Sequence, residues 1–158
     1  MVSFKKIILA KALAKKISAF KKSGKKIVFT NGCFDLIHAG HIHTFQKAKT
    51  FGDILVVAIN TDASVRRLKG KNRPVVGQQN RAKVLAGLEA VDFVTFFSED
   101  TPLEILKLLR PDVLVKGADY KPSEIVGRQY VKKVVRIGMV KGISTSFIIS
   151  KILHAYAK

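Results

Sequence analysis

Five short apolar runs, separated by segments with helical spacing, constrain the fold of this chain more than any other feature. The first two runs, at 27–30 and 54–59, contain no charged residue, and three further runs follow at 91–97, 113–115 and 134–137. Near-continuous apolar runs of this length are typical of strands that are buried on both faces. Because these strands alternate with helical segments, we expect an α/β fold: an open parallel sheet of about five strands with helices on both faces.

The helical segments complete this alternating pattern. Helical spacing and Gly or Pro boundaries predict helices over 3–22, 38–51, 81–88, 102–110 and 145–157. A short helix ending at residue 68 is expected to be capped by Asp62 or Ser64, and Thr101 is the expected cap before Pro102. This order is typical of a Rossmann-like sheet, whose ligands bind beyond the carboxyl ends of the strands. Functional residues are therefore expected in the loops 31–41, 60–62, 116–120 and 142–146.

The charge of the chain is concentrated at its two ends. The 158 residues carry a formal net charge of +18, yet residues 1–34 hold nine lysines and no acid, and residues 125–158 hold seven Lys+Arg and no acid. The segment between them is close to neutral. The sequence pattern therefore divides the chain into a basic amphipathic helix over 1–25 and a main domain over 26–158.

Composition also bears on compartment and partners. The single cysteine, Cys33, excludes an internal disulfide and fits a reducing compartment. No apolar run approaches the roughly 18 residues of a membrane helix, and Lys11 interrupts the first apolar run too early for a secretory signal. The acid-poor N-terminus also fits an organelle presequence, although it contains lysine and no arginine. We expect a cytoplasmic protein with no integral membrane segment and, lacking any recognised nucleic-acid-binding signature, no nucleic-acid partner.

The loop after the first strand has the chemistry of a phosphate site. His38 and His41 are three residues apart at the start of a helix, with Gly40 between them. A helix N-terminus offers unpaired N–H groups and a positive dipole end, so imidazoles placed there favour an anion. The simpler interpretation is that His38 caps the helix and His41 lies on its surface. Zinc binding by His38, His41 and His43 is less favoured, because helical zinc ligands are typically four residues apart.

Two motifs resemble a known family. The residues Gly32-x-Phe34-Asp35-x-x-His38-x-Gly40-His41 resemble the signature of the cytidylyltransferase-like nucleotidyltransferases, and residues 142–146 are similar to that family's later Gly-Ile-Ser-Thr-Thr signature. The resemblance is closest to the D-glycero-β-D-manno-heptose 1-phosphate adenylyltransferases, here as a standalone domain, and extends from 27 to 152. Glycerol-3-phosphate cytidylyltransferases are the alternative. They carry arginine where this chain has Glu89 and Met139.

The resemblance to the heptose subfamily implies an activity and a set of site residues. The implied reaction moves AMP from ATP to D-glycero-β-D-manno-heptose 1-phosphate, giving ADP-heptose and pyrophosphate for lipopolysaccharide or another cell-surface glycan.

The implied catalytic residues are His38, His41, Lys49 and Lys116. The implied nucleotide contacts are Asn31, Gly32, Cys33, Phe34, Gly40, Gly117, Ser144 and Thr145. The implied substrate contacts are Asp35, Asn60, Lys69, Arg81 and Asp119. Mg²⁺ is the implied cofactor, held mainly by ATP phosphates, with Asp35 as the nearest protein candidate. A homodimer is also expected.

Simpler interpretations stay open for several positions. Lys49 and Arg81 fit solvated helix residues, and Ser144 fits an N-cap. Lys69 and Arg73 lie on a Gly/Pro loop that is expected to be mobile and to close over substrate. The rival class of function is a basic module that binds nucleic acid or a membrane surface, and a third is an inactive relative that serves as a scaffold.

Overall fold

The protein forms one parallel sheet in the expected order. The structure is a computed structural model and describes residues 4–138 and 140–157, so residues 1–3, 139 and 158 of the predicted segments lie outside the described residues. The strands are β1 (Ile27–Gly32), β2 (Ile54–Asn60), β3 (Phe93–Phe97), β4 (Val113–Gly117) and β5 (Lys133–Ile137). Their order across the sheet is β3-β2-β1-β4-β5, and every neighbouring pair is parallel. The predicted α/β, Rossmann-like fold is confirmed.

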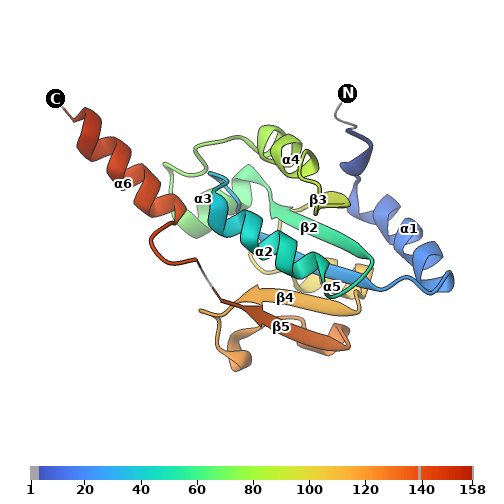
Figure 1. The fold of residues 1–158 in the computed structure, drawn as a ribbon. Coiled ribbons are helices and arrows are strands. Elements are labelled where there is room, and N and C mark those ends of the chain that lie inside the picture. Colours follow the sequence, from blue (N-terminus) through green and yellow to red (C-terminus); the bar gives the residue numbers. More distant parts are fainter. Residues whose placement is uncertain (1–3, 139, 158) are drawn as a thin grey trace.

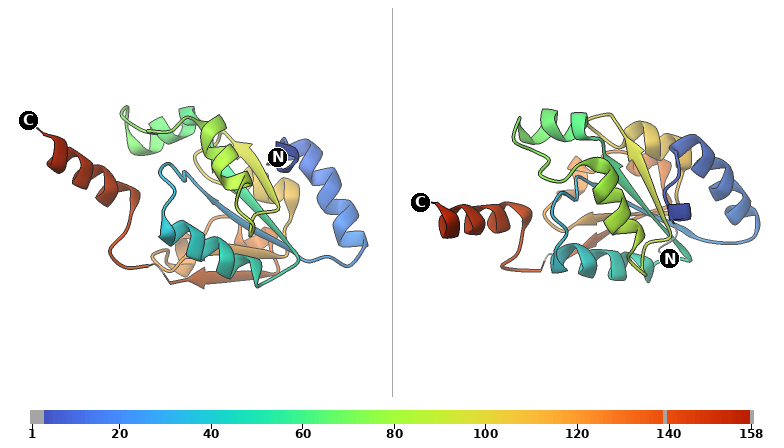
Figure 2. Two further views of the ribbon diagram at one scale, coloured as in Figure 1. Left: turned by 45° about the horizontal axis from the view of Figure 1, so that its top comes forward. Right: turned by 90° about the horizontal axis from the view of Figure 1, so that it is seen from above.

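Helices cover both faces of the sheet, as Figures 1 and 2 show. One face packs against α2 (Ala39–Lys49) and α4 (Gln78–Ala86), whose buried residues include Phe45 and Leu85. The other packs against α1 (Ala10–Lys22) and α5 (Leu103–Leu109) through residues such as Leu13 and Leu106. Alternate strand residues supply the two cores, because successive side chains of a strand point to opposite faces.

The strand register sets the level of the carboxyl edge. Thr30 in β1 lies opposite Val57 in β2 and Val115 in β4. The next residues, Asn31 of β1 and Lys116 of β4, therefore lie at the same level near the carboxyl ends of their strands. Both belong to loops in which the sequence predicts functional residues.

The N-terminal segment contains a shorter helix than predicted. A 3-10 turn, η1 (Phe4–Lys6), precedes an extended stretch in which Ile7 bridges to Val94 of β3. The Lys6 ammonium donates to the carbonyl oxygens of Leu88 at 3.2 Å and Val91 at 2.7 Å. These contacts hold the chain beside β3, so the helix begins at Ala10 instead of residue 3. Leu13 and Ile17 of α1 are fully or almost fully buried in the same core as the strands.

Several other helix starts differ from the predictions in their cap or in their first residue. In α3 (Asp62–Lys69) the cap is Thr61, whose hydroxyl accepts from the Ser64 amide at 3.4 Å, and neither Asp62 nor Ser64 has that role. The N-cap position of α5 is Pro102, with no side-chain hydrogen bond from Thr101 or any other cap. In α4 the helix starts at Gln78, three residues earlier than expected.

The last helix, α6 (Thr145–Tyr156), extends away from the body of the molecule (Figure 2). None of its residues is buried, and its exposed apolar side chains are Phe147, Ile152, Leu153 and Tyr156. Throughout residues 4–138 and 140–157, no helix has the length and apolar character needed to cross a membrane.

Candidate active site

The carboxyl ends of β1 and β4 hold a buried lysine. Lys116 is only 7% exposed, and its ammonium donates to the Asn31 side-chain oxygen at 2.6 Å. The same ammonium lies 5.3 Å from the centre of the Tyr120 ring. Burial lowers the pKa of Lys116 to about 8, against an opposing effect of the Asp119 carboxylate. The lysine is therefore a positive charge held at the ligand edge with little water around it.

Two stacked imidazoles lie at the start of α2, directly after β1. The rings of His38 and His41 are 3.9 Å apart between centroids. His38 is the N-cap residue, and its Nδ1 accepts a hydrogen bond from the Gly40 amide at 3.2 Å. Because Nδ1 is the acceptor, a neutral His38 carries its proton on Nε2, which is left to donate to a ligand. His38 therefore caps the helix as the simpler interpretation predicts, and capping leaves its Nε2 available to a ligand.

His41 is held in a more enclosed position. Its ring packs edge-on against Phe34, with centroids 5.2 Å apart, and its buried Nδ1 has no hydrogen-bond partner among the described residues. Burial, with a smaller effect from His38, lowers the pKa of His41 to about 4. His41 is therefore a neutral imidazole at neutral pH. A buried polar atom without a partner is costly, and it indicates a site whose ligand or solvent completes the hydrogen bonding.

The two glycines of the first motif are required by neighbouring rings. A Cβ on Gly40 would lie 3.0 Å from the His38 ring, and a Cβ on Gly32 would lie 3.1 Å from the Phe34 ring. Phe34 itself has a positive φ of 44°, which turns its ring back over the strand end. The His38 imidazole therefore lies directly against the Gly40 backbone.

The later motif joins this site through the start of α6. Ser144 caps the helix by accepting from the Phe147 amide at 3.1 Å, and the Thr145 hydroxyl donates to the Leu36 carbonyl at 3.4 Å. A Cβ on Gly40 would also come within 3.6 Å of Ile143. Residues about a hundred positions apart in sequence therefore meet, and two helix N-termini face the same edge of the sheet.

Comparison with known proteins identifies the family. The family model described as cytidylyltransferase-like matches residues 29–151, which contain the histidine pair, Lys116 and the start of α6. The chain belongs to the cytidylyltransferase-like family. The family resemblance that the two sequence motifs indicated is confirmed.

Several relatives of this cytidylyltransferase-like chain are bifunctional proteins. It is 52% identical to "Bifunctional protein HldE" of Pelobacter propionicus and 53% identical to that of Geobacter sulfurreducens, and each match covers 92% of the chain. The chain spans about a third of the length of these relatives (30% and 31%). Among solved structures, the lipopolysaccharide core biosynthesis protein from Thermoplasma volcanium matches with a TM-score of 0.65 and 29% identity, covering 75% of this chain and 100% of that one.

Asp35, predicted as a substrate or metal contact, is fully engaged inside the protein. Its carboxylate accepts from the amides of Val75 at 2.9 Å and Val76 at 2.8 Å, and it forms an ion pair with Arg73 at 2.5 Å. Burial alone would raise the pKa of the Asp35 carboxyl, but these hydrogen bonds and the arginine hold it below its usual range. Asp35 thus anchors Arg73, Val75 and Val76 of the Gly/Pro loop to the loop after β1.

Arg81 corrects another prediction, because its guanidinium is 1% exposed and faces the protein. It donates to the carbonyl oxygens of Val76, Cys33 and Asn60 and to the Asp62 carboxylate, the last at 2.8 Å. These four acceptors take four of the five guanidinium N–H donors. Arg81 instead positions the loops that follow β1 and β2.

Asn60 and Cys33 lie beside this guanidinium. The Asn60 side chain is buried and donates to the Ser64 hydroxyl at 2.9 Å, while the Cys33 thiol contacts its side-chain oxygen at 3.9 Å. Burial raises the pKa of Cys33, against an opposing effect of Lys69 and the nearby arginines. Both side chains support the loop after β1, and the exposed Lys69 lies beside it.

The structure does not bring Lys49 to the site. Lys49 ends α2, eleven residues after His38, which is about 16 Å along a helix. Its ammonium binds the Asp92 carboxylate at 2.5 Å and the Asp53 carbonyl at 2.6 Å, at the amino ends of β3 and β2. An ion pair at the opposite edge of the sheet replaces the expected contact with a triphosphate.

Asp119 folds back over the end of β4, since a Cβ on Gly117 would lie 2.2 Å from its carboxylate oxygen. Tyr120 and Asp62 were not predicted as site residues, although Tyr120 lies beside Lys116 and Asp62 pairs with Arg81. The four-residue spacing of Lys116 and Tyr120 after a strand is a signal for the first of these; nothing local in the sequence indicates the pairing of Asp62 with Arg81.

Proposed function

We propose that this chain transfers AMP from ATP to D-glycero-β-D-manno-heptose 1-phosphate, forming ADP-heptose and pyrophosphate. The stacked pair His38 and His41 at the start of α2 is the observation that carries the proposal. Support for the acceptor comes from the resemblance to the heptose subfamily, from identity of about half to the HldE proteins, and from a solved relative named for lipopolysaccharide core biosynthesis.

The reaction needs positioning and charge stabilisation more than proton transfer. A phosphate oxygen of the sugar phosphate attacks the α-phosphorus of ATP, and the bond from that phosphorus to the bridging oxygen breaks. Pyrophosphate leaves with the bonding electron pair. Because the attacking oxygen is already ionised, no general base is required, and the barrier falls when donors surround the charge that develops at the α-phosphate.

The histidines supply such donors in a neutral form. His38 presents Nε2–H, since its Nδ1 is bound to the Gly40 amide. His41, with its pKa lowered to about 4, also donates as a neutral ring. The dipole of α2 and its first N–H groups add partial positive charge at the same point. The start of α6, with Ser144 and Thr145, offers a second anion-binding end.

The other proposed contacts surround this centre. Asn31, Gly32, Cys33 and Phe34 border the nucleotide through the loop after β1, with Gly40 and Gly117 shaping the edge. Asp119 and Lys69 are the proposed contacts to the sugar phosphate. Asn60, Arg81 and Asp35 act behind them by holding the loops in place.

Lys116 gives the proposed reaction a pH dependence. With a pKa of about 8, the lysine is charged below that pH and loses its proton above it. We expect kcat/KM for ATP, which reports the free enzyme, to fall as the pH rises through about 8. In Lys116→Arg the alkaline limb should move beyond pH 9, because arginine stays charged. The exposed Lys121→Arg is the matched control, and an unchanged limb in Lys116→Arg would contradict this role.

Mg²⁺ fits this site only as a companion of the nucleotide. Among residues 4–138 and 140–157, no three carboxylate, histidine or cysteine groups are placed to hold a metal ion together. Asp35, the candidate ligand, has both oxygens occupied by Arg73 and two amides. The phosphate oxygens of ATP are the remaining ligands, so no step is assigned to a protein-held ion.

Replacing Asp35 separates a metal role from a structural role. We expect Asp35→Asn to lower the free energy of unfolding by about 2–4 kcal/mol, because it leaves the partly buried Arg73 and two amides poorly paired. The Mg²⁺ concentration for half-maximal activity should not change. Urea unfolding and a Mg²⁺ titration of pyrophosphate release measure the two effects, with the exposed Asp100→Asn as control. A large rise in the Mg²⁺ requirement, with stability kept, would restore Asp35 as a ligand.

The substrates are tested by crossing two nucleotides with two acceptors. Pyrophosphate release is measured with ATP or CTP and with heptose 1-phosphate or glycerol 3-phosphate. We expect turnover with ATP and the heptose phosphate. Turnover only with CTP and glycerol 3-phosphate would establish the cytidylyltransferase alternative. A homodimer is proposed with the same subfamily in mind, and light scattering of the purified chain tests it.

A further inference from the structure

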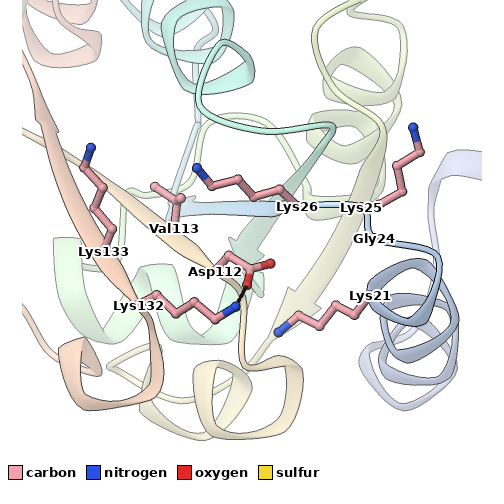
Figure 3. A pocket seen from close by; sticks show the side chains of 8 residues that line it. All are labelled: Lys21, Gly24, Lys25, Lys26, Asp112, Val113, Lys132 and Lys133. Atoms are coloured by element: carbon pink, nitrogen blue, oxygen red, sulfur yellow. Dashed lines mark ion pairs between the residues drawn. The ribbon is translucent and has the colours of Figure 1, made fainter.

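A basic pocket lies at the edge of the sheet opposite the candidate active site. It has a volume of about 450 Å³ and opens where β1, β4 and β5 begin, next to the end of α1 (Figure 3). It is lined by Lys21, Gly24, Lys25, Lys26, Asp112, Val113, Lys132 and Lys133. The active-site residues leave β1 at its other end, about 20 Å away for a strand of six residues. The pocket is thus separate from the proposed reaction.

The lysines that line the pocket come from the two basic ends of the chain. Three of its lysines come from residues 1–34 and two from residues 125–158, the segments that carry no acidic residue. The fold brings them together because β5 lies beside β4 and β4 beside β1. Five lysines face a single carboxylate in the lining, which leaves an excess of four positive charges around the cavity.

The single carboxylate is already committed to the fold. Asp112 accepts from the Ile27 amide at 2.9 Å with one oxygen and pairs with Lys132 at 2.9 Å with the other. Burial would raise its pKa, but these contacts and the nearby Lys21 hold the pKa of Asp112 below the usual range. Asp112 therefore stays ionised and holds strand starts together. It neutralises only one of the five lysines.

The other lysines lack strong partners. Lys25 pairs with Asp53 at 3.6 Å, a loose contact in which both side chains are about half exposed. Lys21 donates to the Arg110 carbonyl, and the Lys133 ammonium lies 6.0 Å from the centre of the Phe51 ring. In the part of the chain that the structure describes, no ion pair joins Lys21, Lys26 or Lys133 to a carboxylate. Lys21 and Lys132 extend toward each other across the mouth, with Asp112 between them (Figure 3).

We propose that this pocket binds a phosphate-bearing anion. Lysine ammonium groups are compact, strongly hydrated charges that suit phosphate oxygens, and several of them on flexible stems can close around one group. Repulsion among unpaired ammonium groups in a concave site raises the local positive potential, and a polyanion relieves it. The ligand is either a small phosphorylated molecule or the headgroup of an anionic lipid, which share this chemistry.

The test uses sodium tripolyphosphate as the probe and reads each site separately. In ¹H–¹⁵N spectra of the whole chain, the amides of Gly24 and Val113 report the pocket, and those of Gly40 and His41 report the active site. We expect saturable shifts at Gly24 and Val113, with an affinity that weakens as salt is raised. The double variant Lys26→Gln/Lys133→Gln should bind roughly tenfold more weakly at the pocket, a loss of about 1.4 kcal/mol. Its pyrophosphate-release activity should be unchanged.

A second pair of exposed lysines provides the matched control. Lys15→Gln/Lys16→Gln removes the same charge from α1, outside the pocket, and should leave the shifts at Gly24 and Val113 intact. Thermal melting confirms that both double variants are folded. Absence of saturable shifts at the pocket and of retention on lipid, or equal weakening by both double variants, would overturn the proposal, since net charge alone would then explain the binding.

Vesicles distinguish the two sources of phosphate. Co-sedimentation is compared on vesicles of phosphatidylglycerol with phosphatidylcholine and on phosphatidylcholine alone. Retention that needs phosphatidylglycerol and is lost in Lys26→Gln/Lys133→Gln supports the proposal with a lipid headgroup as ligand. Shifts with tripolyphosphate but no retention support it with a small phosphorylated ligand. None of these readouts depends on turnover, so they stand apart from the test of the proposed function.

Discussion

His38→Ser is expected to lower kcat/KM about 10²- to 10³-fold while leaving the fold and its stability nearly unchanged. Serine is a good N-cap, so the hydroxyl can replace Nδ1 as acceptor for the first amides of α2. It cannot replace Nε2, which is the group proposed to donate to the phosphates. Loss of one preorganised donor to a developing charge has an effect of this size. Steady-state pyrophosphate release and thermal melting measure the two quantities.

Two further variants make this result interpretable. His38→Ala removes the cap as well, and it should lose about 1 kcal/mol of stability in addition to the activity. His43→Gln removes an imidazole from the same helix, outside the stacked pair, and should keep both activity and stability. If His38→Ser retained activity within about threefold of the unmodified protein, the histidine would be a cap only, and the proposed phosphate role would fail.

Arg81→Met is expected to be the most destabilising of these substitutions, with a loss of about 3–5 kcal/mol in the free energy of unfolding. The methionine approximates the arginine stem, but it leaves Asp62 and three backbone carbonyls without the donor they share. Removing one partner from a buried charged network has a cost of this order. Urea unfolding at 25 °C measures it.

The matched control is Arg67, which pairs with Asp100 at 2.9 Å on the surface. Both partners there are at least half exposed, so Arg67→Met should cost less than about 1 kcal/mol. In Arg81→Met the loop after β1 also loses its anchor, and kcat/KM should fall together with stability. A stable Arg81→Met protein with specifically weakened ATP binding would show that the guanidinium reaches the nucleotide after all.

The predicted helices show where sequence patterns suffice and where they do not. Apolar periodicity predicted α1. Its start at Ala10 is set by the contacts that Lys6 and Ile7 make with β3 and with the segment before it. Periodicity reports which face of a segment is apolar. It carries no information on a strand about ninety positions away that pairs with the backbone of the same segment and so keeps it out of the helix.

The candidate site divides in the same way. The spacing of His38, Gly40 and His41 after an apolar run was enough to predict an anion site, because the chemistry is local to one strand end and one helix start. Lys116 followed from its place at the end of a second strand. The position of Lys49 could not be predicted in this way. A lysine at the end of α2 gives the same sequence pattern whether its side chain contacts a ligand or pairs with Asp92.

By itself, the sequence determined an α/β chain with a parallel sheet and an uneven distribution of charge, and it predicted a phosphate site at the start of α2. Only the tertiary structure decided that Asp35 and Arg81 face inward, because their partners lie in loops distant in the chain. Only the order of the strands decided that lysines from both ends surround one pocket. Local patterns record which groups are present, whereas burial and pairing depend on the folded chain that surrounds each group.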